Sequence, residues 1–267
     1  MRKWFKQLDD ILRGETTRMS LLTEGRFEIP IGGLSAAIVL LGVSYGLCMG
    51  SYAMIRTSGQ AYMQLIASAV KLPSLFFLTL IVTFPSLYVF NALIGTRLSV
   101  GSALRLLTAS LGVILAVLAS LGPIVVFFAL STKSYPFMLL LNVATGTIAG
   151  LLGLGFLLRT LDRLVIVQER TESLGSGSTA DSEQAKKPED KVTEPTGALD
   201  RVGKFTTRKA RSVFRAWTIV FALVGAQMSW VLRPFIGAPT LPFQWFRVRE
   251  SNFFVAVFRA LVSLFSS

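Results

Sequence analysis

Residue types that carry most enzyme and metal chemistry are scarce in this chain of 267 residues. Histidine is absent, and Cys48 is the single cysteine. The commonest general base and metal ligand are therefore missing, and no disulfide can form within the chain. The sequence also has no glycine loop with a phosphate-binding lysine, and no pair of cysteines spaced for redox or metal chemistry. We predict a protein that is not an enzyme and that has no catalytic residue, metal site or cofactor.

Three amide side chains lie inside long apolar stretches: Asn91, Asn142 and Gln227. In lipid, such side chains either line a polar pathway or form hydrogen bonds between helices. The apolar stretches that contain them carry no charged residue, whereas ion-coupled carriers normally need one inside the membrane. We therefore favour hydrogen bonding between helices and keep a polar pathway as the alternative.

A mixed cluster near the C-terminus contains Trp245, Arg247, Arg249 and Glu250. These residues suit contact with a lipid headgroup or with a protein partner. A simpler interpretation is that they begin and anchor the last helix, because an acid is favoured near a helix N-terminus and tryptophan is favoured at the membrane interface. We favour the simpler interpretation.

Residues 201–215 contain six basic residues and no acidic one. Five of them step by three or four positions and form one stripe on a helix: Arg201, Lys204, Arg208, Arg211 and Arg215. Such a stripe binds anionic lipid headgroups at about 1 kcal/mol per residue near the surface, or orients the membrane crossing that follows; the two roles are compatible. The net charge of +12 thus indicates anionic membrane lipids as partners rather than nucleic acid.

The elements that must position these residues are apolar helices, since 52% of the residues are hydrophobic. Four stretches of at least 25 residues contain no charge: Pro30–Ile55, Leu72–Thr96, Leu106–Thr132 and Ser134–Leu158. Each is long enough to cross a hydrocarbon core of about 30 Å as a helix. Ala216–Leu232 is shorter but viable as a fifth crossing. We predict an all-α membrane protein with about five transmembrane helices and no ionisable residue inside any of them.

Glycines at a spacing of four predict close helix packing. Gly42, Gly46 and Gly50 lie in the first apolar stretch, and Gly146 and Gly150 lie in the fourth. Contacts within the chain and contacts between copies both fit the first set, and we favour contacts within the chain.

Amphipathic helices are predicted at both ends of the chain. Residues 3–13 suit a helix that lies on the membrane face or docks on a partner protein, and residues 251–267 suit an interfacial helix with Arg259 near its middle. The chain divides into an N-terminal cytoplasmic segment (1–28), a four-helix membrane domain (29–160), a disordered cytoplasmic linker (161–200), and a C-terminal part (201–267) with the basic stripe, the fifth crossing and the last helix.

The distribution of positive charge predicts the orientation of the protein. With five crossings, twenty of the 27 Lys and Arg residues fall on the side that holds the N-terminus and the linker. Cytoplasmic segments carry the excess of positive charge, so we expect these parts inside and the C-terminus outside.

Several segments resemble an uncharacterised family of bacterial polytopic inner-membrane proteins. They are LTLIVTFPSLYVFNALIGTRL (78–98), AVLASLGPIVVFFALSTKSYPFMLLLNV (116–143), GAQMSWVLRPFIG (225–237) and FRVRESNFF (246–254). The resemblance implies a helical protein of the bacterial inner membrane and carries no activity. Our leading hypothesis is an accessory or scaffolding subunit that packs against other membrane proteins or against itself. The alternative is a transporter or channel for a neutral or lipidic substrate.

Overall fold

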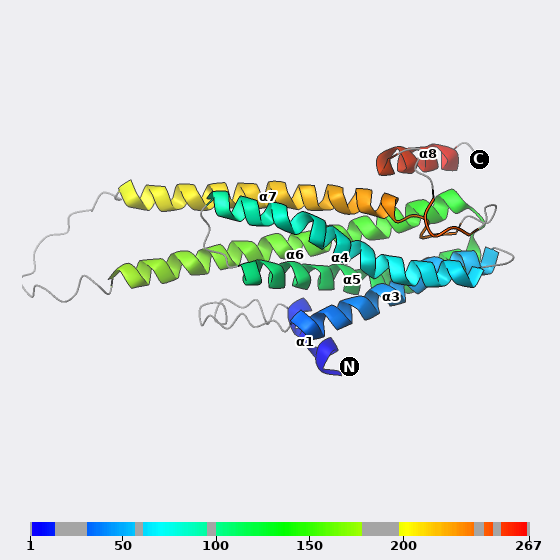
Figure 1. The fold of residues 1–267 in the computed structure, drawn as a ribbon, viewed down its shortest axis with the longest axis horizontal. Coiled ribbons are helices and arrows are strands. Elements are labelled where there is room, and N and C mark those ends of the chain that lie inside the picture. The colour runs from blue at the N-terminus through cyan, green and yellow to red at the C-terminus, as the bar shows by residue number, and fades with distance from the viewer. Residues whose placement is uncertain are drawn as a thin grey trace, which may run out of the picture.

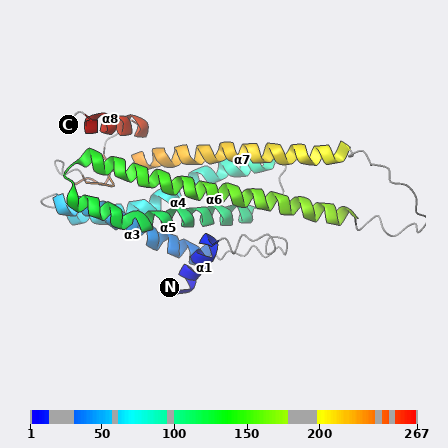
Figure 2. The ribbon, with the colours of Figure 1, turned by 180° about the vertical axis from the view of Figure 1, so that it is seen from behind.

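All of the described structure is helical or irregular. A computed structural model describes residues 2–13, 31–56, 61–94, 100–177, 198–237, 243–247 and 252–265, and no strand occurs within these ranges. The long helices lie side by side along one axis (Figures 1 and 2). Their bounds are α1 (Arg2–Leu12), α3 (Ile31–Arg56), α4 (Ala61–Ile94), α5 (Val100–Ser131), α6 (Tyr135–Gly177), α7 (Ala198–Val231) and α8 (Phe253–Phe265).

Four helices in the described part of the chain contain segments long and apolar enough to cross a membrane. These segments are Gly32–Arg56 in α3, Ala61–Ser86 in α4, Leu104–Ser131 in α5 and Tyr135–Thr160 in α6. At about 1.5 Å per residue, each is longer than a hydrocarbon core of about 30 Å. The prediction of four long apolar helices is therefore confirmed, and these helices fit a multi-pass membrane protein.

The second apolar segment begins earlier than predicted and contains a lysine. We expected it to start at Leu72, with residues 61–70 either extending the helix or lying at the membrane interface. The structure shows the extension: α4 is helical from Ala61, and Lys71 lies inside the segment. The stretch before Lys71 is apolar enough to continue the helix toward its N-terminus, so the charge does not mark a boundary. The second apolar segment, as the structure bounds it, therefore contains an ionisable residue that the predicted start at Leu72 left out.

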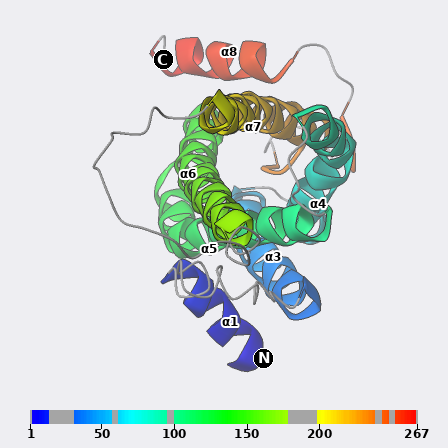
Figure 3. The same cartoon turned by 90° about the vertical axis from the view of Figure 1, so that its left-hand side faces the viewer.

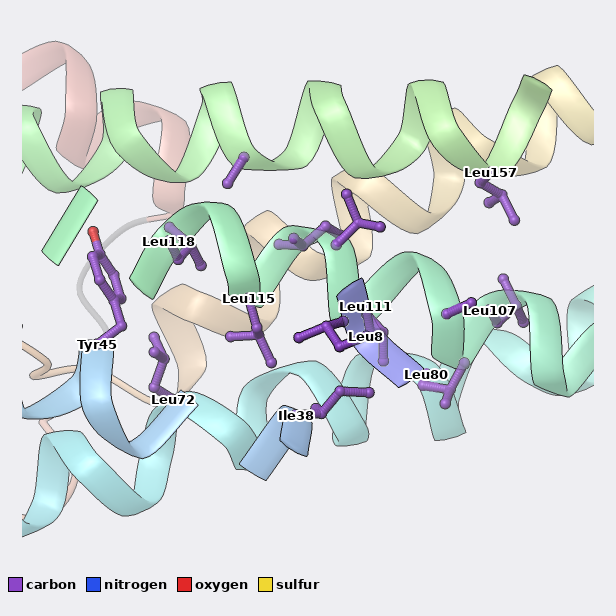
Figure 4. Close-up of a cluster of buried hydrophobic side chains, with 14 of the residues drawn as sticks. Leu8, Ile38, Tyr45, Leu72, Leu80, Leu107, Leu111, Leu115, Leu118 and Leu157 are labelled. Carbon is purple, nitrogen blue, oxygen red and sulfur yellow. The ribbon is translucent and has the colours of Figure 1, made fainter. Parts of the chain in front are cut away.

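The helices pack around α3 and α5. α3 lies against α4 and α5, while α5 also contacts α6, and α7 lies against α4 and α6. Figure 3 shows this arrangement along the bundle, with α1 and α8 on opposite sides. A continuous set of buried apolar side chains joins the helices (Figure 4). It includes Leu8 of α1, Ile38 and Tyr45 of α3, Leu72 and Leu80 of α4, Leu107, Leu111, Leu115 and Leu118 of α5, and Leu157 of α6.

The glycines of α3 bring its backbone directly against α4. A Cβ added at Gly46 would lie 2.5 Å from the carbonyl oxygen of Ser68 and 2.7 Å from the Cα of Ala69. Cβ atoms added at Gly42 and Gly50 would meet atoms of α4 at 3.0 and 2.9 Å. Close backbone approach of this kind increases van der Waals contact between helices in lipid. The glycines of α3 thus lie at a contact within the chain.

The glycines of α6 differ from the expectation. A Cβ added at Gly146 or Gly150 would meet nothing within 4 Å. Thr145 and Ala149 are the buried positions of this part of α6, and each open glycine follows one of them by a single residue. Gly153, four residues after Ala149, packs against Ile114 and Ser110 of α5 instead.

The helices α6 and α7 extend well beyond the apolar segments. α6 continues to Gly177 and α7 begins at Ala198, so the linker predicted for residues 161–200 is helical at both of its ends; residues 178–197 lie outside the described part. Apolar and charged residues alternate at helical spacing after residue 160, which allows α6 to continue. Residues 201–215 therefore share one helix with the proposed fifth crossing.

The first helix docks on the bundle of its own chain. Leu8 and Ile11 of α1 are buried, and α1 contacts α3 and α5. Lys6, Asp9 and Arg13 are exposed, and the Arg13 Nε lies 2.8 Å from an Asp9 carboxylate oxygen. Residues 14–28 of the predicted N-terminal segment lie outside the described part.

We expect Gly46→Ala to destabilise the protein, because the added methyl group would collide with the α4 backbone. The matched variant Gly146→Ala makes the same change on an open helix surface. Relative to this control, Gly46→Ala should lower the free energy of unfolding by about 1–3 kcal/mol. Thermal unfolding in detergent measures the difference, and equal unfolding temperatures would contradict the close α3–α4 contact.

Candidate functional site

Lys71 is the buried charge around which the candidate site is built. The residue is only 3% exposed, and the sequence of α4 is apolar on both sides of it. The ammonium group donates hydrogen bonds to the carbonyl oxygens of Pro234, at 3.2 Å, and of Trp245. Charged groups at membrane depth are costly and pair with charges or backbone carbonyls, so a lysine in this position indicates a specific role.

The described residues after α7, 232–237 and 243–247, lie against the first half of α4 and are called the returning segment here. The Gln64 amide donates to the carbonyl oxygens of Pro234 and Phe235, each at 3.1 Å, and the Ser68 hydroxyl donates to the Phe235 carbonyl. The Arg233–Pro234 peptide bond is cis. Non-helical backbone beside apolar helices needs donors from neighbouring elements. Gln64, Ser68 and Lys71 supply them from one side of α4.

Two arginines join Lys71 at this place. The Arg247 N–H donates to the Arg233 carbonyl oxygen at 3.4 Å, which brings the two ends of the returning segment together. Arg247 also lies within electrostatic range of Lys71, and both arginines lie within range of the Tyr135 hydroxyl at the start of α6. The basic cluster, defined as Lys71, Arg233 and Arg247, therefore combines charges from two distant parts of the chain.

Aromatic rings surround the basic cluster. The Lys71 Nζ lies 5.0 Å from the ring centre of Phe246 and 5.9 Å from that of Trp245, and the Arg233 guanidinium lies 3.8 Å from the ring centre of Trp230. Cation–π contacts of this kind contribute about 0.5–2 kcal/mol each. Trp245 and Phe246 are 46% and 61% exposed, so the cluster reaches the protein surface.

The arrangement is suited to holding an anion. Arginine guanidinium groups bind phosphate or carboxylate with two parallel hydrogen bonds. Within the described ranges, no three His, Cys, Asp or Glu side chains gather as metal ligands would.

Only part of this site was predicted from the sequence. The structure brings Trp245 and Arg247 into it, while Arg249 and Glu250 lie outside the described residues. Lys71 and Arg233 were missed as site residues. The apolar stretch before Lys71 was the available signal, because it shows that this lysine has apolar sequence on both sides.

Of the three amide side chains predicted to line a pathway or to join helices, Asn142 forms a hydrogen bond between two helices. The Tyr45 hydroxyl of α3 donates to the Asn142 side-chain oxygen at 3.2 Å and lies 2.7 Å from the Thr145 hydroxyl, both on α6. The Asn142 amide in turn donates to the Met138 carbonyl oxygen. Asn142 thus links α3 to α6. Gln227 is half-buried on α7, and the Asn91 side chain lies outside the described residues.

The basic stripe lies on the first half of α7. Arg215 is exposed there. The side chains of the other four members lie outside the described residues: Arg201, Lys204, Arg208 and Arg211. The structure therefore places the stripe on a helix, without describing the surroundings of most of its charges.

Fold and site together define an α-helical protein with four helices suited to cross a membrane and a basic, aromatic cluster beside one of them. Comparisons with protein-family models, with curated proteins and with solved structures found no match.

Replacing Lys71 by methionine should release the returning segment, because the Pro234 and Trp245 carbonyls would lose a donor. Each lost donor to a buried group costs about 1–3 kcal/mol. Trypsin should therefore cut after Arg247 faster in Lys71→Met than in the control Lys133→Met, which changes an exposed lysine. Mass analysis of the released C-terminal fragment measures the rate. Equal rates would show that Lys71 does not hold the segment.

Tyr45→Phe tests whether Asn142 serves helix packing. The change removes the hydroxyl that joins α3 to α6 and should lower the free energy of unfolding by about 0.5–2 kcal/mol. Tyr62→Phe, at an exposed position on α4, is the control and should leave the unfolding temperature unchanged. An unchanged unfolding temperature for Tyr45→Phe would show that the Tyr45–Asn142 hydrogen bond does not stabilise the α3–α6 contact.

Proposed function

We propose that this protein is a non-catalytic subunit of a membrane complex, which packs through α6 against another membrane protein or a second copy of itself. The observation that carries the proposal is the open pair Gly146 and Gly150. They lie on the apolar segment of α6, of which 22% is buried, against 39–50% for the other three such segments. The α6 segment is therefore the least covered of the four.

Open glycines at a spacing of four favour association with a further helix. In lipid, the hydrophobic effect does not drive helices together, so close packing at small residues contributes much of the association. The equivalent glycines of α3 are already covered by α4. Ile148, Leu151 and Leu152 are exposed on the same segment of α6 and supply further apolar surface.

The proposal includes a bacterial inner-membrane location with five crossings. α7 would form the fifth crossing, and two contacts support its antiparallel pairing with α4: the Trp217 indole N–H donates to the Ser86 hydroxyl at 3.0 Å, and Gly225 lies beside Thr79. The excess of basic residues supports a cytoplasmic N-terminus and linker and an outside C-terminus. The amphipathic character of α8 supports an interfacial position, since Phe254 and Phe258 are exposed.

For the alternative, a transporter or channel for a neutral or lipidic substrate, one observation is favourable and another is unfavourable. Lys71 removes one argument against it, because this segment does contain an ionisable residue. Asn142 and Lys71, however, form hydrogen bonds between separate elements, to Tyr45 of α3 and to Pro234 after α7, and this use of polar groups favours packing.

Substitution of the two open glycines should weaken the complex. Gly146→Ile combined with Gly150→Ile would place branched side chains on the proposed contact surface. Gently extracted protein should then lose the partner, or the second copy, that accompanies the wild type, as judged by in-membrane crosslinking and by native mass. Gly32→Ile is the control, since Gly32 is also open. A wild type that is monomeric in native membranes would contradict the proposal.

A further inference from the structure

We propose that Arg233 and Arg247 bind the phosphate of an anionic phospholipid headgroup. This site is separate from the α6 surface of the proposed function, and neither depends on the other. The two arginines are half-buried and are joined through the Arg247 N–H and the Arg233 carbonyl oxygen. Their guanidinium groups supply several donors in a planar arrangement that matches phosphate oxygens.

Lys71 positions the two arginines rather than contacting the lipid. It is almost fully buried, and it donates to the carbonyls of Pro234 and Trp245, which lie beside Arg233 and Arg247 in the sequence. One side chain of α4 thus holds both ends of the returning segment. Its positive charge also adds to the potential that attracts an anion.

The surroundings favour a lipid over free phosphate. Arg233 lies two residues after the apolar end of α7, and the exposed Trp245 and Phe246 directly precede Arg247. Basic and aromatic residues together are typical of a membrane interface. The apolar helix α8 lies beside the same end of α7 (Figure 1), with Phe254 and Phe258 exposed. Acyl chains would therefore meet apolar surface next to the arginines. Basic pockets between membrane helices bind anionic headgroups in this way.

The test uses purified full-length protein in detergent, titrated with phosphatidylglycerol, with phosphatidylcholine of the same acyl chains, or with inorganic phosphate. Native mass spectrometry measures the bound fractions. We expect tighter binding of phosphatidylglycerol than of phosphatidylcholine. The double variant Arg233→Gln, Arg247→Gln should weaken phosphatidylglycerol binding by about 25-fold, at about fivefold for each charge removed.

A charge-matched double variant separates a defined site from general attraction. Lys133→Gln with Arg259→Gln also removes two charges, both at exposed positions. It should retain wild-type affinity for phosphatidylglycerol. Equal losses in the two double variants, or equal wild-type binding of both lipids, would overturn the proposal. Binding of inorganic phosphate that blocks phosphatidylglycerol equally well at equal concentration would instead assign the site to free phosphate. Unfolding temperatures of all variants exclude misfolding as the cause of a loss.

Discussion

Backbone carbonyls that lie beside apolar helices must find donors within the protein, and this requirement governs the C-terminal part of the molecule. The described residues 232–237 and 243–247, which follow α7, are not helical, so their carbonyls have no partner within a helix. Gln64, Ser68 and Lys71, spaced three or four residues apart on α4, donate to Pro234, Phe235 and Trp245. A short polar side of α4 thereby fixes the path of a segment more than 160 residues away in the sequence.

The same turns of α4 are held from another side by α3. Gly46 leaves no space for a side chain beside Ser68 and Ala69, and a Cβ added at Gly50 would lie 2.9 Å from the Leu65 Cα. Helix packing against α3 therefore fixes the backbone of Ser68, while its hydroxyl donates to the Phe235 carbonyl of the returning segment. The same turns of α4 thus take part both in close helix packing and in the hydrogen bonds that hold the returning segment. The charges of Arg233 and Arg247 depend on both for their position.

The sequence was sufficient for the apolar helices but not for the site. Runs without charge located most of α3, α5 and the apolar part of α6, because length and hydropathy are local properties. The rule that a charge marks the end of an apolar segment failed at Lys71. The hydrogen-bond acceptors of this lysine are the Pro234 and Trp245 carbonyls, whose approach no local pattern encodes. Glycine spacing likewise does not identify the partner helix. Gly46 and Gly150 each have a glycine four residues away, yet a Cβ added at Gly46 would meet α4 and one added at Gly150 would meet nothing within 4 Å.

Three like charges held together raise the free energy of the folded protein unless an anion lies nearby. Aromatic rings offset part of this repulsion through cation–π contacts with Lys71 and Arg233. A bound phospholipid headgroup, as proposed above, would offset more of the repulsion. Binding would then couple the position of the C-terminal segment to the lipid composition around it, whereas the proposed α6 surface rests on close packing of helices.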